Sequence, residues 1–126
     1  MLGGIVRESV VADKSKAFSL RIIKLYQYLG TEKKEYVMAK QILASGTSIG
    51  ANIREALHAQ SRKDFFAKMY ISYKEANETA YWLELLHESE YIEEEAFESI
   101  YEDCKELIKM LTAITKTSKI SKQKSD

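Results

Sequence analysis

The chain of 126 residues contains no proline and only one cysteine, Cys104. A single thiol excludes an internal disulfide framework and fits a reducing cytoplasm. No apolar run approaches the roughly 20 residues that cross a membrane, and the first residues lack the long apolar segment of a signal peptide. These absences leave one domain by length, with enough residues to bury a single core, and we expect it in the cytoplasm.

Net charge is also lacking, but positive and negative residues are segregated along the chain. Residues 1–74 carry 13 Lys and Arg against 6 Asp and Glu, whereas residues 75–111 carry 2 against 12, and residues 112–126 carry 4 against 1. This division permits contact between basic and acidic surfaces of different copies, and it leaves basic surface for nucleic acid. Helix faces of opposite sign packed side by side are the alternative.

Four amphipathic patterns follow one another, and no segment alternates with the period of two that a strand requires. They predict helices at about 14–29, 33–59, 62–87 and from residue 93 onward. The predicted fold class is an all-α, antiparallel up-down-up-down four-helix bundle over residues 13–116. We expect residues 1–12 to be a mobile N-terminal segment and residues 117–126 to be a basic, flexible tail.

Residues at the predicted helix ends favour these boundaries. Asp13 is the expected N-cap of the first helix, and Gly30 is the glycine expected just after its last residue. Ser61 is the expected N-cap of the third helix, and Asp64 stands three residues later, near a capping box.

The segment 41–56, QILASGTSIGANIREA, contains two glycines and yet keeps an apolar stripe with steps of three and four. A glycine within a helix costs roughly 1 kcal/mol against alanine, so Gly46 and Gly50 require a reason. The stripe predicts an unbroken helix in which these small residues let another helix approach closely. A loop across residues 45–50 is the alternative, because Ser-Gly-Thr-Ser is also typical of loops.

The third predicted helix has two apolar faces. Its core face consists of Phe65, Met69, Ala76, Ala80 and Leu83. The second face, named the acidic flank below, consists of Ile71, Glu75, Glu78, Trp82 and Leu85. A tryptophan on a second apolar face often marks a subunit contact, so the acidic flank is the predicted oligomer interface. A core wide enough to cover Trp82 is the alternative.

Basic residues alternate with tyrosines on the opposite side of the same helix. Lys63, Tyr70, Lys74 and Tyr81 fall near one line, named the basic stripe below. Such a stripe offers charge for phosphates and flat rings for bases. The candidate nucleic-acid residues are Arg54, Arg62, Lys63, Tyr70 and Lys74, with the lysines of the C-terminal tail. A solvated helix face is the alternative.

Two Glu-x-x-His pairs, Glu55 with His58 and Glu84 with His87, are typical of di-iron bundles. Antiparallel helices place these pairs at opposite ends, about 40 Å apart at 1.5 Å per residue. Cys104 occupies a core heptad position of the last helix, which favours a buried side chain over a nucleophile. We therefore expect no catalytic residue, no metal and no cofactor.

Two strings, QILASGTSIGANIREA and QSRKDFFAKMYISYKEANETAYWLELL at 60–86, resemble the 23S rRNA intervening-sequence proteins. The resemblance covers about residues 13–116. It implies a bacterial, cytoplasmic four-helix bundle that often forms a homopentameric ring and is not known for catalysis. Similar accessory proteins of retroelements bind a reverse transcriptase and nucleic acid through basic surfaces. Many relatives carry arginine where this chain has Ala44, and this departure weakens a nucleic-acid role that depends on that charge.

The sequence therefore predicts a non-catalytic, oligomeric scaffold whose main partner is a second copy of itself, in a ring of five. RNA or a nucleic-acid-processing protein is a further expected partner. The alternative is a weak nucleic-acid-binding accessory protein without sequence specificity. In the scaffold hypothesis, Glu75 and Glu78 meet basic residues such as Arg54 or Lys68.

Overall fold

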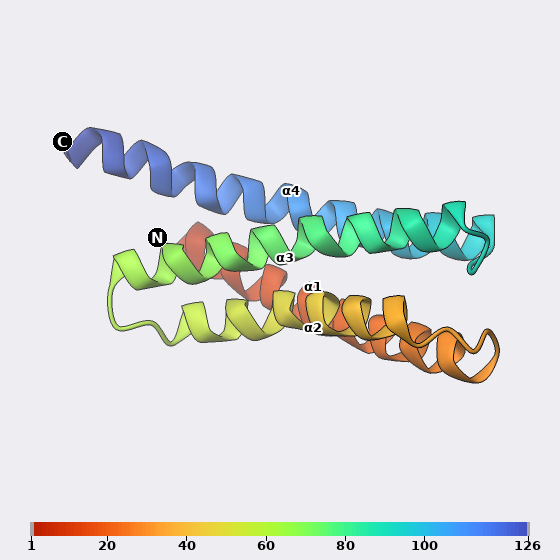
Figure 1. Cartoon of the computed structure of the whole chain (residues 1–126). Coiled ribbons are helices and arrows are strands. Elements are labelled where there is room, and N and C mark those ends of the chain that lie inside the picture. The colour runs from red at the N-terminus through yellow and green to blue at the C-terminus, as the bar shows by residue number, and fades with distance from the viewer. Residues whose placement is uncertain (1, 126) are drawn as a thin grey trace.

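The computed structural model describes the backbone of residues 2–125 and the side chains of residues 8–116. This part of the chain forms four helices and no strand, which confirms the all-α prediction. They are α1 (Leu2–Thr31), α2 (Val37–Leu57), α3 (Arg62–Glu88) and α4 (Glu94–Ser125). Figure 1 shows the chain reversing direction at each of the three connections, so that each helix runs antiparallel to the one before it.

Each helix packs against the next one in the chain, and α1 also contacts α4. The four helices therefore enclose one core. The apolar heptad predicted for the last helix lies in that core, with Ile100, Cys104, Leu107, Leu111 and Ile114 buried. Phe97, the first residue of this heptad, is partly buried against the core.

The first helix differs from the prediction at both ends. It already includes Leu2, so Asp13 is not its N-cap, and it continues to Thr31, so Gly30 lies within it. Val11 explains the longer helix, because its fully buried side chain belongs to the same stripe as Phe18 and Ile22. Whether residues 1–12 and 117–126 are mobile stays a prediction, since side chains 1–7 and 117–126 lie outside the described part.

The other boundaries lie closer to the predictions. The Ser61 hydroxyl accepts a hydrogen bond from the Asp64 backbone N–H at 3.0 Å, which confirms the predicted N-cap of α3. The helix α2 begins at Val37 instead of residue 33, because Lys34 adopts a left-handed turn conformation with φ 55°. The helix α4 begins at Glu94 but continues past the predicted end near residue 116.

The segment 41–56 is helical throughout, as the apolar stripe predicts. A Cβ atom added to Gly46 would lie 2.8 Å from Ile22 Cγ1 of α1, and one added to Gly50 would lie 3.2 Å from Ser15 Oγ. Contacts below 3 Å between carbon atoms are severe overlaps, so the close approach of α1 requires glycine at position 46. The predicted small-residue contact between helices is confirmed.

The contact between α2 and α3 contains buried hydroxyl groups. Ser72 donates a hydrogen bond to the Ile49 carbonyl at 2.8 Å, and the hydroxyls of Thr79 and Ser45 are 2.9 Å apart. These groups meet their hydrogen-bonding requirement across the contact, so their burial carries little desolvation penalty. The pairs also favour one register of α2 against α3, because a shift by one residue would break both contacts between the two helices.

None of the four helices, within the residues described, is both long and apolar enough to cross a membrane.

Candidate interaction surfaces

The acidic flank lies on the side of α3 that faces away from α4. Ile71 is 37% exposed, and Trp82 and Leu85 are partly buried. The Trp82 indole N–H donates a hydrogen bond to Glu78 at 3.1 Å, and the ring of Tyr81 meets the indole edge to face. The core thus covers Trp82 only in part, and apolar surface remains available beside two carboxylates.

The two carboxylates of the acidic flank are close to each other. Partial burial, followed by the neighbouring Glu78 carboxylate, raises the pKa of Glu75 above its ordinary value, and Lys74 opposes the change. Lys68, one predicted partner, pairs instead with Glu55 of α2 at 3.4 Å. The predicted contact of Lys68 with these carboxylates is therefore wrong within the chain, and no ion pair of the described residues involves Glu75 or Glu78.

The basic stripe is partly assembled on the outer side of α3. Tyr70 is 45% exposed, its ring stacks on Tyr73 at 5.8 Å, and the Lys74 ammonium lies 5.6 Å from its ring centroid. Lys63 is also exposed and lies about two turns before Tyr70, near the start of α3. Three of the five candidate nucleic-acid residues, Lys63, Tyr70 and Lys74, therefore share one surface.

The other two candidate nucleic-acid residues lie elsewhere. The Arg62 guanidinium stands 5.5 Å from the centroid of the Phe66 ring at the start of α3. Arg54 is exposed in the last turn of α2. The structure therefore does not bring all five candidates into one site.

The Glu-x-x-His pairs have ordinary structural contacts. Glu84 accepts a hydrogen bond from the Tyr101 hydroxyl at 2.7 Å, which raises the pKa of Tyr101 to about 12. His87 contacts Glu94 at 2.5 Å and stacks on Phe97. Among the described side chains, no three His, Cys, Asp or Glu residues stand close enough together to hold a metal ion.

Cys104 is fully buried, and its thiol donates to the Ala76 carbonyl at a distance of 3.4 Å. Burial raises the pKa of the thiol to about 12. Since the thiolate is the reactive form, Cys104 is an inert core side chain at neutral pH.

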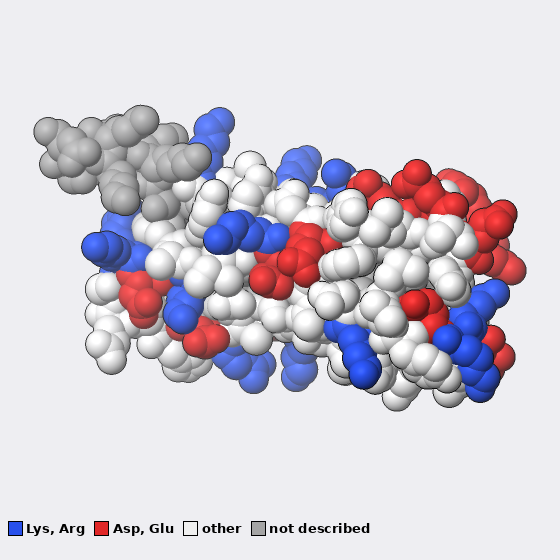
Figure 2. Space-filling model, viewed as in Figure 1, with Lys and Arg blue, Asp and Glu red and all other residues white. Residues whose placement is uncertain are grey.

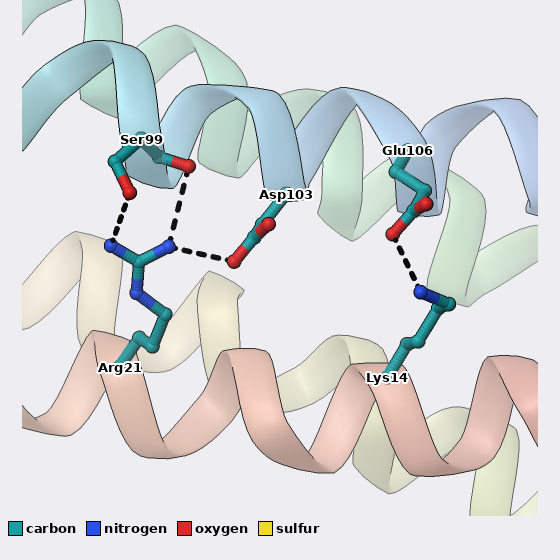
Figure 3. A network of polar contacts seen from close by, with 5 residues as sticks. All are labelled: Lys14, Arg21, Ser99, Asp103 and Glu106. Atoms are coloured by element: carbon teal, nitrogen blue, oxygen red, sulfur yellow. Dashed lines mark hydrogen bonds and ion pairs between the residues drawn. The ribbon is translucent and has the colours of Figure 1, made fainter.

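Sequence reasoning missed the ion pairs that join α1 and α4. Arg21 contacts Asp103 at 2.7 Å and the Ser99 hydroxyl at 3.0 Å, and Lys14 contacts Glu106 at 3.0 Å. Figure 3 shows Arg21 and Lys14 reaching from α1 to α4. No signal in the sequence pairs these residues, because the two helices are 62 residues apart between their ends.

A groove of about 560 Å³ opens beside Arg21, between the second half of α1 and the start of α4. Its apolar lining includes Leu25, Tyr28, Ile92, Ala96 and Ile100. Three charged residues, Arg21, Lys24 and Glu93, also line it. Because Arg21 is paired with Asp103, neither sign of charge dominates the groove.

Charge is segregated on the folded surface as it is along the chain. Figure 2 shows acidic side chains gathered at the upper right, around the start of α4, with basic side chains below them and over the rest of the view. The first turn of α4 contains Glu94 and Glu95, which the positive end of the helix dipole stabilises.

The fold and these surfaces define a four-helix bundle with candidate surfaces for binding and no assembled catalytic centre among the described residues. The model of the 23S rRNA-intervening sequence protein family matches residues 7–113. The chain therefore belongs to this family, as the two sequence strings indicate.

A solved structure supports both the fold and the family. It is a protein of unknown function from the S23 ribosomal protein family of Bacteroides thetaiotaomicron VPI-5482. The two chains are 59% identical, and the match covers 87% of this chain and 98% of the other with a TM-score of 0.86. No curated protein matches this chain.

Proposed function

We propose that this protein is a non-catalytic scaffold that assembles into a homo-oligomer through the acidic flank of α3. The observation that carries the proposal is the composition of this surface: Ile71, Trp82 and Leu85 stand beside two carboxylates that form no ion pair with any described side chain. Tryptophan is enriched among the residues that dominate binding energy at protein interfaces. The flank therefore has the anchor that an interface requires.

Charge supports the same proposal. Glu75 is partly buried and lies near the Glu78 carboxylate, so the charged form of Glu75 is disfavoured in the isolated chain. A cation supplied by a neighbouring copy would lower the pKa of Glu75 and add a charge-assisted contact. The proposed assembly is a ring of five, the number that the family resemblance implies.

Replacement of Trp82 by alanine tests the role of the flank. We expect Trp82→Ala to weaken self-association at least tenfold, with a much smaller change in the thermal midpoint of the dissociated chain, because the core covers only part of the indole. Sedimentation velocity over a range of protein concentrations measures the association. Tyr70→Ala is the matched control, because Tyr70 is an aromatic residue of α3 that is 45% exposed, lies outside the flank and contacts Tyr73 and Lys74 instead of Trp82. Equal weakening by both variants would contradict the assignment of the interface.

Weak binding of nucleic acid through the basic stripe is a second candidate function. The observation that favours it is the grouping of Tyr70, Tyr73 and Lys74 on one exposed surface. Contacts of this kind reach mainly phosphates, so affinity is expected to fall steeply between about 50 and 200 mM salt.

A filter-binding titration with single-stranded RNA tests this second candidate. We expect Lys74→Glu to reduce retention at low salt, and removal of residues 117–126, which contain three lysines, to reduce it further. Absence of binding by the intact chain at low salt would remove this candidate and leave the scaffold proposal unchanged.

A further inference from the structure

Long segments of α1 and α2 contain basic residues and no acidic residues. From Lys14 to Thr31 in α1, and from Val37 to Arg54 in α2, the sequence contains no Asp or Glu. Lys14 and Arg21 turn toward α4, where they form ion pairs. Lys16, Lys40 and Arg54 are exposed and form no ion pair with any described side chain. The outer side of α1 and α2 is therefore positively charged.

The same side of the bundle exposes apolar side chains. Leu20 is 55% exposed and Ile23 is 37% exposed, and both lie on α1. On α2, Leu43 and Arg54 share a helical stripe with Gly50, where an added Cβ would lie 3.2 Å from Ser15 Oγ of α1. This stripe thus lies along the border with α1. We name this surface the basic face, which consists of Lys16, Leu20, Ile23, Lys40, Leu43 and Arg54.

The basic face and the acidic flank match in character. Each combines partly exposed aliphatic or aromatic side chains with charges of one sign, and the signs are opposite. Isolated exposed leucines are common, but an apolar patch with unpaired charge of one sign is typical of a surface that binds an oppositely charged partner. A second copy of this chain therefore has the surface chemistry that each of the two surfaces requires.

We propose that the acidic flank of one copy docks on the basic face of α1 and α2 in the next copy. This inference rests on the proposed scaffold function and deepens it by naming the second half of the interface. Trp82 inserts between apolar side chains of the basic face, and Glu75 and Glu78 meet its cations. Because like charges in contact cost free energy, the pairing of opposite charges favours one orientation of the two copies over others.

The positions of the two surfaces on the bundle favour a closed ring of copies over a filament. The helix α2 contacts both α1 and α3, so the basic face and the acidic flank lie on neighbouring sides of the bundle. A contact between two different surfaces repeats from copy to copy. When the surfaces lie on neighbouring sides, each copy turns by a large angle relative to the last, and the chain of contacts closes into a small ring. Surfaces on opposite sides would instead extend into a filament.

Charge reversal tests the pairing of the two surfaces. The first variant carries Glu75→Lys and Glu78→Lys, and the second carries Lys16→Glu and Arg54→Glu. Each variant presents surfaces of one sign on both sides of the contact, so we expect its self-association to weaken at least tenfold. The third variant combines all four substitutions in one chain. Its surfaces are again complementary, and we expect association within threefold of the unmodified protein at about 50 mM salt.

Matched controls separate pairing from general charge effects and from unfolding. Glu102→Lys and Lys109→Glu change the charge of exposed residues on α4, outside both surfaces, and are expected to leave association unchanged. Circular dichroism verifies that each variant is helical. If a reversed variant does not fold, Glu78→Gln and Arg54→Gln replace the reversals, and each is expected to weaken association by about threefold.

Four results would separate this inference from the proposed function. Assembly of the unmodified protein, loss in both reversed variants and recovery in the fourfold variant support the pairing. Assembly that survives both reversals overturns the pairing while the scaffold proposal stands. An unmodified protein that remains a monomer overturns both. Loss of single-stranded RNA binding, without loss of assembly, in the Lys16→Glu and Arg54→Glu variant assigns the basic face to nucleic acid and overturns the pairing.

Discussion

The helix α1 has two neighbours, and it meets them in different ways. Against α2, it approaches so closely that a Cβ atom at Gly46 would lie 2.8 Å from Ile22. Against α4, it is joined by Lys14–Glu106 and Arg21–Asp103, whose side chains are between 40% and 52% exposed, and an open groove lies beside them. The α1–α2 contact depends on close packing, whereas the α1–α4 contact includes exposed ion pairs.

This difference indicates which residues contribute most to the stability of the fold. Close packing of buried apolar groups contributes kilocalories per side chain, whereas exposed ion pairs contribute about 0–1 kcal/mol each. The fold therefore needs the small residues of α2 far more than the charges of α1 and α4. The strong segregation of charge along the chain therefore contributes little to the stability of one copy.

The largest effect is expected at the close contact. Gly46→Leu places a branched side chain against Ile22 and lowers the free energy of unfolding by about 3 kcal/mol, the upper end for overpacked cores. Chemical denaturation measures this change. Gly46→Ala is the smaller probe, and it also destabilises the protein despite alanine's better helix propensity. A stabilised Gly46→Ala variant would show that the two helices separate at little cost.

A smaller effect is expected one turn further along α2. Gly50→Leu lowers the free energy of unfolding by roughly 1–3 kcal/mol, and by less than Gly46→Leu. The reason is the wider spacing at this turn, where an added Cβ would lie 3.2 Å from a serine hydroxyl that can rotate and 3.5 Å from backbone atoms. An unchanged denaturation midpoint would count against a close contact at this position.

A still smaller effect is expected at the contact that depends on charge. Arg21→Ala removes contacts with Asp103 and Ser99, yet we expect a loss of only about 0.5–1 kcal/mol, because the pair is exposed to solvent. Added salt reduces this loss further. A loss above about 2 kcal/mol in denaturation at high salt would mean that the α1–α4 contact determines the fold as strongly as the glycine contact.

The last effect is expected only at alkaline pH, and it concerns the hydrogen bond between Tyr101 and Glu84, which joins α3 and α4. Glu84 raises the pKa of Tyr101 to about 12 from its ordinary value near 10. The neutral phenol is favoured in the fold, so this stabilisation is complete below about pH 10 and is lost as the pH rises toward 12. Ultraviolet titration of the phenol measures the pKa of Tyr101, and we expect Glu84→Gln to lower this pKa. Titration of Tyr101 unchanged by Glu84→Gln would contradict the assigned cause.

Most of the fold follows from local pattern. The stripe through Gly46 and Gly50 predicts both the helix and the close contact, and Ser61 predicts the start of α3. The predicted start of α1 was wrong because Asp13 is a residue type that often caps helices. Val11 is nevertheless spaced from Phe18 so as to continue the core stripe. Asp13 is simply exposed within the helix.

The surfaces were harder to predict, because they depend on helices that are distant in sequence. Spacing on α3 alone identifies the acidic flank and the basic stripe. The partners of Lys68, Arg21 and Lys14 depend instead on how α2 and α4 are placed around α1 and α3. The buried hydroxyls of Ser72 and Thr79 were likewise missed. A polar residue is expected to face solvent unless its hydrogen-bond partner on a neighbouring helix is known.

Sedimentation equilibrium of the full chain at micromolar concentration tests self-assembly most directly. A ring of five gives a mass five times that of the 14.5 kDa chain. Because opposite charges join the copies in this account, association is expected to weaken between about 50 and 500 mM salt. A mass that agrees with the single chain at both salt concentrations would contradict the account.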